Sequence, residues 1–390
     1  MTDTSATACH YLPDVIVTPP EAVDEASSVL ETGPMEAGEL NDFLGGVENE
    51  DELRLFTEQV AVFRVDSTDE ALERLREKEI PGHPVHGLGP SNHIKSMPGT
   101  DPIGAPTPDP VPHIAASSQG RIVAVIDTGV TKEIPDWLRT GIHPHSEEEA
   151  LASGEIASHG TFVAGLIRRI APEHTIVQTI ARRRPIGAFM NDHEPRDDKF
   201  RLTTELDVLR AMIRLLFILG RETECGVAAL NLSLGGVTCF EDDPTTFTLS
   251  RALDLWRNEH PDAPVFAAGG DRDGERPVFP GAFEYVRSVA AAENGGRRVV
   301  WKDNHQAGDP PLDEPDRPWI TDVAPGCDLL GPSGAAVDDW VTWSGSSFAT
   351  AIATACYASR RHHVVQRGLV WWPNPNVRYG AIPGLVVPFY

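Results

Sequence analysis

The sequence predicts an α/β protein with a mainly parallel central sheet, preceded by a smaller α+β region. Beyond residue 115, strand-like apolar runs alternate with helical ones, which is typical of βαβ units. Six prolines between residues 98 and 112 exclude helix there and indicate an extended connector. The alternating runs cover residues 121–126, 160–170, 176–180, 204–219, 227–234, 249–258 and 265–268. We expect an N-terminal region at 1–97, a linker at 98–114 and a larger domain at 115–390.

The N-terminal region carries most of the negative charge. Residues 1–112 contain 22 acidic and 6 basic side chains, so they contribute −16 to a net charge of −25. Residues 1–55 show little periodicity and predict loops and short helices. The β-branched and aromatic run at 59–65 predicts a strand, and a capping box formed by Ser67 and Glu70 opens a predicted helix to about Glu79.

The overall charge and the first twenty residues indicate which partners and which compartment to expect. An acidic protein repels phosphate backbones and anionic lipids, so neither nucleic acid nor a membrane surface is expected to bind. The first twenty residues lack the basic start and apolar run of a signal peptide, and no apolar stretch is long enough to cross a bilayer. These features favour a cytoplasmic protein.

The cysteines favour the same compartment. The five cysteines include no C-x-x-C pair, so we expect reduced thiols rather than a disulfide framework. Cys225 and Cys239 flank one predicted strand and could approach each other, but free thiols are the default interpretation.

Three distant residues have the chemistry of acyl transfer. Asp127 ends an apolar run, so its carboxylate would lie at the carboxyl end of a parallel strand, where open sheets build their sites. His159 stands near the start of an amphipathic helix, at an end that we expect to be exposed. Ser347 opens a helix of small residues, whose dipole would stabilise negative charge near the hydroxyl. Each residue alone has a structural explanation, but in this order they supply orienting acid, base and nucleophile.

With these residues the chain resembles the subtilisin family of serine peptidases. NLSLGG at 231–236 is similar to the family's substrate-binding strand, and VFAAGG at 265–270 to the opposite wall of its primary specificity pocket. The resemblance covers about residues 121–360 and implies a three-layer subtilisin-like domain with Ser347 as nucleophile, His159 as general base and Asp127 as the orienting acid. The cleft residues that it implies are Ser233, Leu234, Gly235, Ala267, Ala268 and Gly269.

The chain departs from the family at the oxyanion hole. The family has Ala-Gly-Asn where this sequence has Ala-Gly-Gly-Asp at 268–271, so either Gly270 or Asp271 takes the place of the asparagine. An ionised carboxylate there would repel the oxyanion unless it is protonated.

Three functions remain open at this stage. The resemblance implies a serine endopeptidase that cleaves peptides or proteins and requires no cofactor. A catalytically weakened relative that binds peptides without efficient turnover is the alternative. An aspartic peptidase, suggested by the Asp-Thr-Gly at 127–129, would need a second such motif, which only a homodimer could supply. The sequence does not predict the oligomeric state.

Two further features have open interpretations. His143 and His145 precede three glutamates at a spacing typical of no metal site, and Asp271 and Asp273 lack the spacing of an EF-hand calcium loop. No metal site is therefore predicted, and structural calcium is possible but not supported.

The N-terminal region is either a prodomain that assists folding and blocks the cleft, as in many subtilisins, or a permanent accessory domain.

Overall fold

The central sheet of the larger domain has seven strands in the order β17-β14-β11-β10-β9-β5-β6. Neighbouring strands are parallel, except that β14 and β17 are antiparallel. The strands are β5 (Ile122–Asp127), β6 (Thr175–Ile180), β9 (Val227–Leu232), β10 (Val265–Ala268), β11 (Arg287–Ala292), β14 (Asp322–Pro325) and β17 (Trp372–Pro373). The computed structural model describes residues 9–47, 49–89, 103–105, 120–132, 134–143, 155–185, 188–189, 201–221, 226–239, 246–271, 276–293, 297–301, 312–313, 317–334, 340–359 and 372–373.

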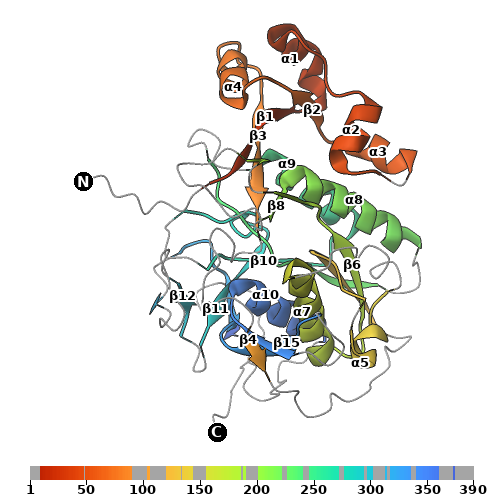
Figure 1. Ribbon diagram of the computed structural model, residues 1–390, viewed down its shortest axis with the longest axis vertical. Coiled ribbons are helices and arrows are strands. Elements are labelled where there is room, and N and C mark those ends of the chain that lie inside the picture. Colours follow the sequence, from red (N-terminus) through yellow and green to blue (C-terminus); the bar gives the residue numbers. More distant parts are fainter. Residues whose placement is uncertain are drawn as a thin grey trace.

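Helices cover both faces of this sheet (Figure 1). One pair packs on one face and the second pair on the other, each over its own apolar core. Along β5, Ile122, Ala124 and Ile126 join one core, whereas Val123 and Val125 join the other. A strand buried on both faces is a continuous apolar run, which explains why this one is evident in the sequence. The pairs are α7 (Glu155–Ile170) with α10 (Ser346–Ala358), and α8 (Glu205–Arg221) with α9 (Phe247–Glu259).

The three-layer α/β architecture predicted from the sequence is confirmed. Each predicted run from 121–126 to 265–268 is a strand or a helix of the expected type, with ends that differ by a few residues. Within the described part of the chain, no helix is both long and apolar enough to cross a bilayer.

The strand order reverses at β5. From β5 the chain passes outward to β6 and then returns to β9, on the other side of β5. The carboxyl ends of the strands at such a switch point border a crevice in which open α/β sheets bind ligands. Asp127 is the last residue of β5 and Ser233 directly follows β9, so both lie at this crevice.

The N-terminal region consists of a small antiparallel sheet with helices. β1 pairs with β2 on one side and with β3 on the other. The predicted strand at 59–65 and the helix after Ser67 are present, and Ser67 Oγ accepts a hydrogen bond from the Glu70 amide at 3.4 Å. The elements are β1 (Tyr11–Thr18), a 3₁₀ turn (Pro20–Ala22), α1 (Val23–Leu30), α2 (Ala37–Leu44), α3 (Glu50–Thr57), β2 (Ala61–Arg64), α4 (Thr68–Arg76) and β3 (His83–Leu88).

The remaining elements are short and lie at the edges of the larger domain. β4 falls within the predicted linker at 98–114 and pairs antiparallel with β16, so this piece of the connector belongs to a small sheet of the larger domain. The rest of the linker and nearly all of the C-terminal aromatic tail lie outside the described residues. These elements are β4 (Ile103–Ala105), α5 (Asp136–Arg139), β7 (Arg183–Pro185), β8 (Arg201–Thr204), β12 (Val299–Val300), β13 (Leu312–Asp313), β15 (Leu329–Pro332) and β16 (Trp340–Trp343).

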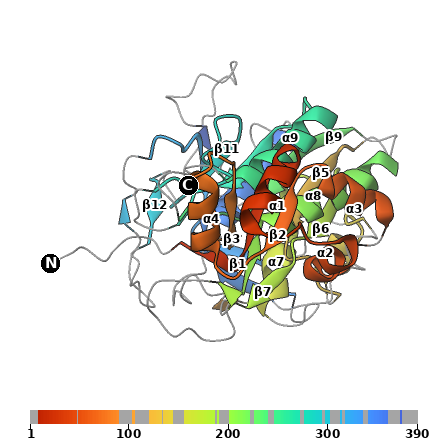
Figure 2. The same cartoon turned by 90° about the horizontal axis from the view of Figure 1, so that it is seen from above.

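The N-terminal region and the larger domain share a second sheet, of order β2-β1-β3-β8-β7. β3 joins β8 of the larger domain at Gly87 and Leu88. Figure 2 shows the N-terminal helices and strands stacked over the larger domain in the region of α8. The two parts are therefore connected by main-chain hydrogen bonds as well as by side-chain packing.

A disulfide between Cys9 and Cys239 also joins the two parts, with Cα atoms 5.2 Å apart. The prediction that all thiols are reduced is wrong for this pair, because two residues 230 positions apart are brought together only by the fold. Cys225 lies outside the described residues. Cys327 and Cys356 are free, and burial raises the pKa of each thiol to about 12, so both stay protonated near neutral pH.

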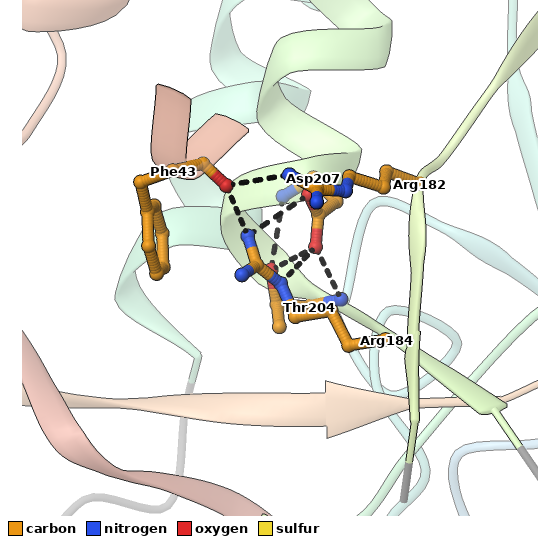
Figure 3. A network of polar contacts seen from close by, with 5 residues as sticks. All are labelled: Phe43, Arg182, Arg184, Thr204 and Asp207. Atoms are coloured by element: carbon orange, nitrogen blue, oxygen red, sulfur yellow. Dashed lines mark hydrogen bonds and ion pairs between the residues drawn. The ribbon is translucent and has the colours of Figure 1, made fainter. Parts of the chain in front are cut away.

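Arginines of the larger domain hold α2 of the N-terminal region (Figure 3). Arg182 and Arg184 donate to the Phe43 carbonyl at 2.8 and 3.0 Å, and the Arg184 guanidinium lies 4.1 Å from the centroid of the Phe43 ring. Arg184 also pairs at 3.1 Å with Asp207, which is fully buried and accepts a hydrogen bond from the Thr204 hydroxyl at 2.6 Å. This contact therefore includes a buried charge that has a specific partner.

Candidate active site

Asp127 and His159 are joined by a hydrogen bond of 2.8 Å between Oδ1 and Nδ1. The Thr128 amide donates to the same carboxylate oxygen at 2.7 Å, and Thr128 Oγ1 accepts from the Gly160 amide at 2.9 Å. These contacts fix the carboxylate on β5 and the imidazole on α7. Because Nδ1 is directed at the carboxylate, Nε2 is the nitrogen left to exchange a proton with a reacting group.

His159 is buried rather than exposed, contrary to the prediction from its place near a helix end. Its exposed fraction is 1%, and aromatic rings pack against the imidazole. The Phe348 and Trp343 centroids lie 5.2 and 5.7 Å from that of His159. Nε2 is buried and has no hydrogen-bond partner among the residues that the structure describes. The imidazole is thus held on one side and open to proton transfer on the other.

Ser347 lies in the first turn of α10. The following residue, Phe348, is the one whose ring packs on His159. Ser347 is fully buried, and its Oγ donates to the Ser233 carbonyl at 3.0 Å. In return Ser233 Oγ donates to the Ser347 carbonyl at 2.7 Å. The positive end of a helix dipole is therefore next to the hydroxyl that was predicted to be the nucleophile.

The loop after β10 brings Asp271 to the same helix end. Gly270 has φ of +102°, a conformation that favours glycine, and makes the turn. Asp271 is 2% exposed, and its Oδ1 accepts a hydrogen bond from the Ser346 amide. Of the two residues predicted for the oxyanion position, Asp271 is the one with a side chain at the start of α10.

A family model described as the subtilase family matches residues 118–376. The chain belongs to the subtilase family. This places it among serine peptidases that hydrolyse peptide or protein substrates, and the class predicted from the motifs is confirmed. Sequence comparison with proteins of curated function found no match.

Three solved proteases are similar to this subtilase in structure. The prenylagaramide maturation protease PagA is 22% identical, over 62% of this chain and 74% of its own, with a TM-score of 0.43. The MycP3 protease from the type VII (ESX-3) secretion system is 20% identical, over 68% and 82%, with a TM-score of 0.43. A lanthipeptide protease is 17% identical, over 63% and 77%, with a TM-score of 0.43.

In this subtilase the predicted substrate strand already pairs with one residue of the N-terminal region. Gly235 pairs antiparallel with Gly89, which directly follows β3 of the N-terminal region. The Gly89 amide donates to the Gly235 carbonyl at 3.0 Å, and the Gly235 amide donates to the Gly89 carbonyl at 2.7 Å. An extended peptide that adds to a cleft strand makes the same pair of main-chain bonds.

Three of the other predicted cleft residues lie at the carboxyl end of β10. Ala267 and Ala268 are buried in β10, which runs parallel to β9, and Gly269 donates to the Val289 carbonyl at 2.9 Å. Leu234 is 4% exposed between Ser233 and Gly235. The structure therefore brings the two predicted walls to one edge of the sheet.

Two residues that the sequence did not single out support the second wall. The Trp319 indole donates to the Gly269 carbonyl at 3.2 Å, and the buried Arg317 donates to the Gly270 carbonyl at 3.3 Å. They lie about fifty positions beyond the loop that they support, in a segment without a recognisable motif. No sequence signal in the chain could have assigned them.

No group of three or more His, Cys, Asp or Glu residues among those described could hold a metal ion. His143 is described, and its amide donates to the Ile176 carbonyl at 2.8 Å. His145, Asp273 and the glutamates at 147–149 lie outside the described residues.

Proposed function

We propose that this subtilase is an endopeptidase in which Ser347 attacks the scissile carbonyl, His159 accepts and returns the proton, and Asp127 orients the imidazole. The observation that carries the proposal is the 2.8 Å bond from Asp127 to His159, which leaves Nε2 for the exchange of a proton. The ring of Phe348, the residue after Ser347, packs on the imidazole. The parts and their order match the requirements of acyl transfer through a covalent acyl-enzyme.

Substrate binding supplies a reason for Ser347 to change its partner. In the structure its hydroxyl donates to the Ser233 carbonyl. A substrate strand that adds along Ser233–Gly235 brings its own N–H groups to this carbonyl row, and they compete for the same acceptor. A rotation about the Ser347 Cα–Cβ bond then turns the hydroxyl toward His159 Nε2.

The developing oxyanion would lie near the start of α10, where the helix dipole stabilises negative charge. Asp271 can contribute a hydrogen bond only when its carboxyl carries a proton. Its Oδ1 already accepts from the Ser346 amide, so the second oxygen is the one that would donate. We therefore expect the enzyme to be slow when Asp271 is ionised and competent when Asp271 carries a proton.

The same carboxylate favours a second candidate function, a peptide-binding subtilase with little turnover. A buried ionised Asp271 next to the nucleophile would repel the tetrahedral intermediate without preventing a peptide strand from pairing with Gly235. The two functions share the cleft and differ in the chemical step.

We also propose that the N-terminal region blocks the cleft and stays attached. Gly89 of this region exchanges main-chain hydrogen bonds with Gly235 of the predicted substrate strand. The disulfide from Cys9 joins Cys239, four residues beyond Gly235. His86 of β3 bonds the buried Glu205 at 2.7 Å and accepts from the Cys239 amide at 3.1 Å. These bonds support a permanent domain that also has the inhibitory role of a prodomain.

A fluorophosphonate probe tests the catalytic proposal. We expect it to label the full chain covalently, and Ser347→Ala to remove the label while leaving the thermal unfolding midpoint close to that of the native chain. Ser346→Ala, one position away on the same helix turn, is the matched control and should keep the label. A folded native chain that binds peptides but takes up no probe favours the binding function. Label that persists in Ser347→Ala rules out this nucleophile.

A further inference from the structure

The cleft segment, residues 87–89 of the N-terminal region, is held from two sides. On the cleft side, Gly89 exchanges main-chain hydrogen bonds with Gly235 of the predicted substrate strand. On the other side, the Gly87 amide donates to the His10 carbonyl at 2.8 Å. The cleft segment therefore connects the start of the N-terminal region with the predicted substrate strand.

The disulfide joins the same two sides by a covalent bond. Cys9 directly precedes His10, and Cys239 is the fourth residue after Gly235. The Cys239 amide also donates at 3.1 Å to Nε2 of His86, the residue just before the cleft segment. The cleft segment is therefore one side of a closed ring of main-chain hydrogen bonds that the disulfide completes.

Main-chain pairing between the start of β1 and β3 is sparse. Tyr11 lies opposite His86. The register then shifts, and the next paired residue of β1 is Ile16, opposite Pro84. A chain end that is held by few main-chain bonds opens locally at a low cost in free energy, unless a covalent bond also holds it. We therefore expect the disulfide to keep this end of β1 on the cleft segment.

The disulfide lies where a thiol from solution can reach it. Cys9 and Cys239 are both partly exposed, whereas Cys356 is buried. A thiol attacks a disulfide as its thiolate, and the raised pKa of Cys327 and of Cys356 keeps both thiols protonated near neutral pH. Neither of these two free cysteines therefore opens the disulfide from within the protein.

We propose that the Cys9–Cys239 disulfide is a redox switch of the cleft, which holds the cleft segment on the substrate strand until a dithiol reduces it. The inference rests on the proposed peptidase function and on blockage of the cleft by the N-terminal region. One thiolate of the dithiol attacks a sulfur of the pair, forms a mixed disulfide and expels the other cysteine as a thiolate, which takes a proton from water. The second thiol of the reductant then displaces the first cysteine. The protein gains two electrons and two protons as a pair of thiols, and the dithiol is oxidised to a disulfide.

Dithiothreitol tests the switch on the full chain. Reduction should raise the initial rate of peptide hydrolysis by at least ~10-fold, because a second link strengthens a two-point contact by about 10²- to 10⁴-fold. Reoxidation should restore the low rate, which separates a switch from unfolding. Cys9→Ser should be fast with and without the reductant. Cys225→Ser is the matched control, since it removes another cysteine of the chain and should keep the full response.

The outcomes separate the switch from the proposed function. Equal rates of fluorophosphonate labelling at Ser347 before and after reduction, or a response that Cys225→Ser abolishes, overturn the switch and leave the peptidase intact. A disulfide that dithiothreitol reduces only when the chain unfolds also overturns it. If no peptide is cleaved and no probe is taken up in either state, the peptidase proposal fails, and the affinity of a peptide for Ser347→Ala decides the switch. Tighter binding after reduction supports the inference; equal binding, or none, overturns it.

Discussion

Replacement of Asp271 by asparagine should accelerate this subtilase, because it removes a charge from the site of the oxyanion and adds a donor. The asparagine Oδ1 can keep the bond from the Ser346 amide that Asp271 accepts now. Its Nδ2 then replaces the second carboxylate oxygen and donates at every pH. Removal of one such donor from a subtilisin lowers kcat by about 10²–10³-fold, or about 2.7–4 kcal/mol, so a gain of up to about 10²-fold is expected where Asp271 is ionised.

The need for a hydrogen-bond donor at this position distinguishes this explanation from a general improvement of the enzyme. An asparagine amide donates at every pH, whereas a carboxyl donates only while it carries a proton. The ratio of Asp271→Asn to native kcat should therefore exceed one wherever Asp271 is ionised.

Steady-state hydrolysis of a chromogenic peptide between pH 5 and 9 measures this ratio. Asp328→Asn is the matched control, since Asp328 and Asp271 both raise the pKa of the Cys327 thiol and so act on the same neighbourhood. Asp328 is exposed and, with φ of 51°, has a conformation that asparagine adopts readily. A ratio at or below one at every pH, or an equal gain in the control, would refute the role given to Asp271.

The disulfide and the Arg184 contacts near the N-terminal region should also have measurable effects, on the free energy of unfolding and on the rate of hydrolysis. Cys9→Ser removes the disulfide to Cys239, whose two cysteines are 230 positions apart, and should lower the free energy of unfolding by up to about 5 kcal/mol. The same change should raise the initial rate of peptide hydrolysis, and an unchanged rate in a folded variant contradicts inhibition by a tethered segment. Arg184→Met leaves Asp207 buried without its cation and should lower the free energy of unfolding in urea by roughly 3–5 kcal/mol. Arg64→Met breaks exposed ion pairs and should lower it by less than about 1 kcal/mol. Equal losses of stability would contradict the special role of the buried pair.

The sequence predicted the parts of the fold whose residues carry their own pattern. The doubly buried β5 is a continuous apolar run, and α8 shows a clear apolar stripe, so both were found close to their true ends. β1 was missed because Pro13 and Asp14 interrupt it, although it is the central strand of the N-terminal sheet. Pairing with β2 and β3, far along the chain, stabilises a segment that local preference disfavours.

The same distinction applies to the candidate site, where short motifs were evident in the sequence and contacts between distant segments were not. Asp127, His159 and Ser347 could be proposed because three short motifs occur in an informative order. The burial of His159 could not, since Trp343 and Phe348 come from nearly two hundred positions away. The choice between Gly270 and Asp271 also needed coordinates, because a shift of one residue in a loop leaves no trace in composition or periodicity.

In the proposed mechanism the acid and the base are positioned before a substrate arrives, and Ser347 alone must change partner. Asp127 and His159 are held by the bond between them and by two bonds of Thr128, none of which involves Ser233, Leu234 or Gly235. Ser347 instead donates to Ser233, two residues from the glycine that binds Gly89. In the proposed mechanism an occupant of the cleft therefore acts on Ser347 and not on His159. If Gly89 and an incoming peptide compete for the same strand, release of the N-terminal segment should change the access of substrate to Ser347 and leave the geometry of the Asp127–His159 pair as it is.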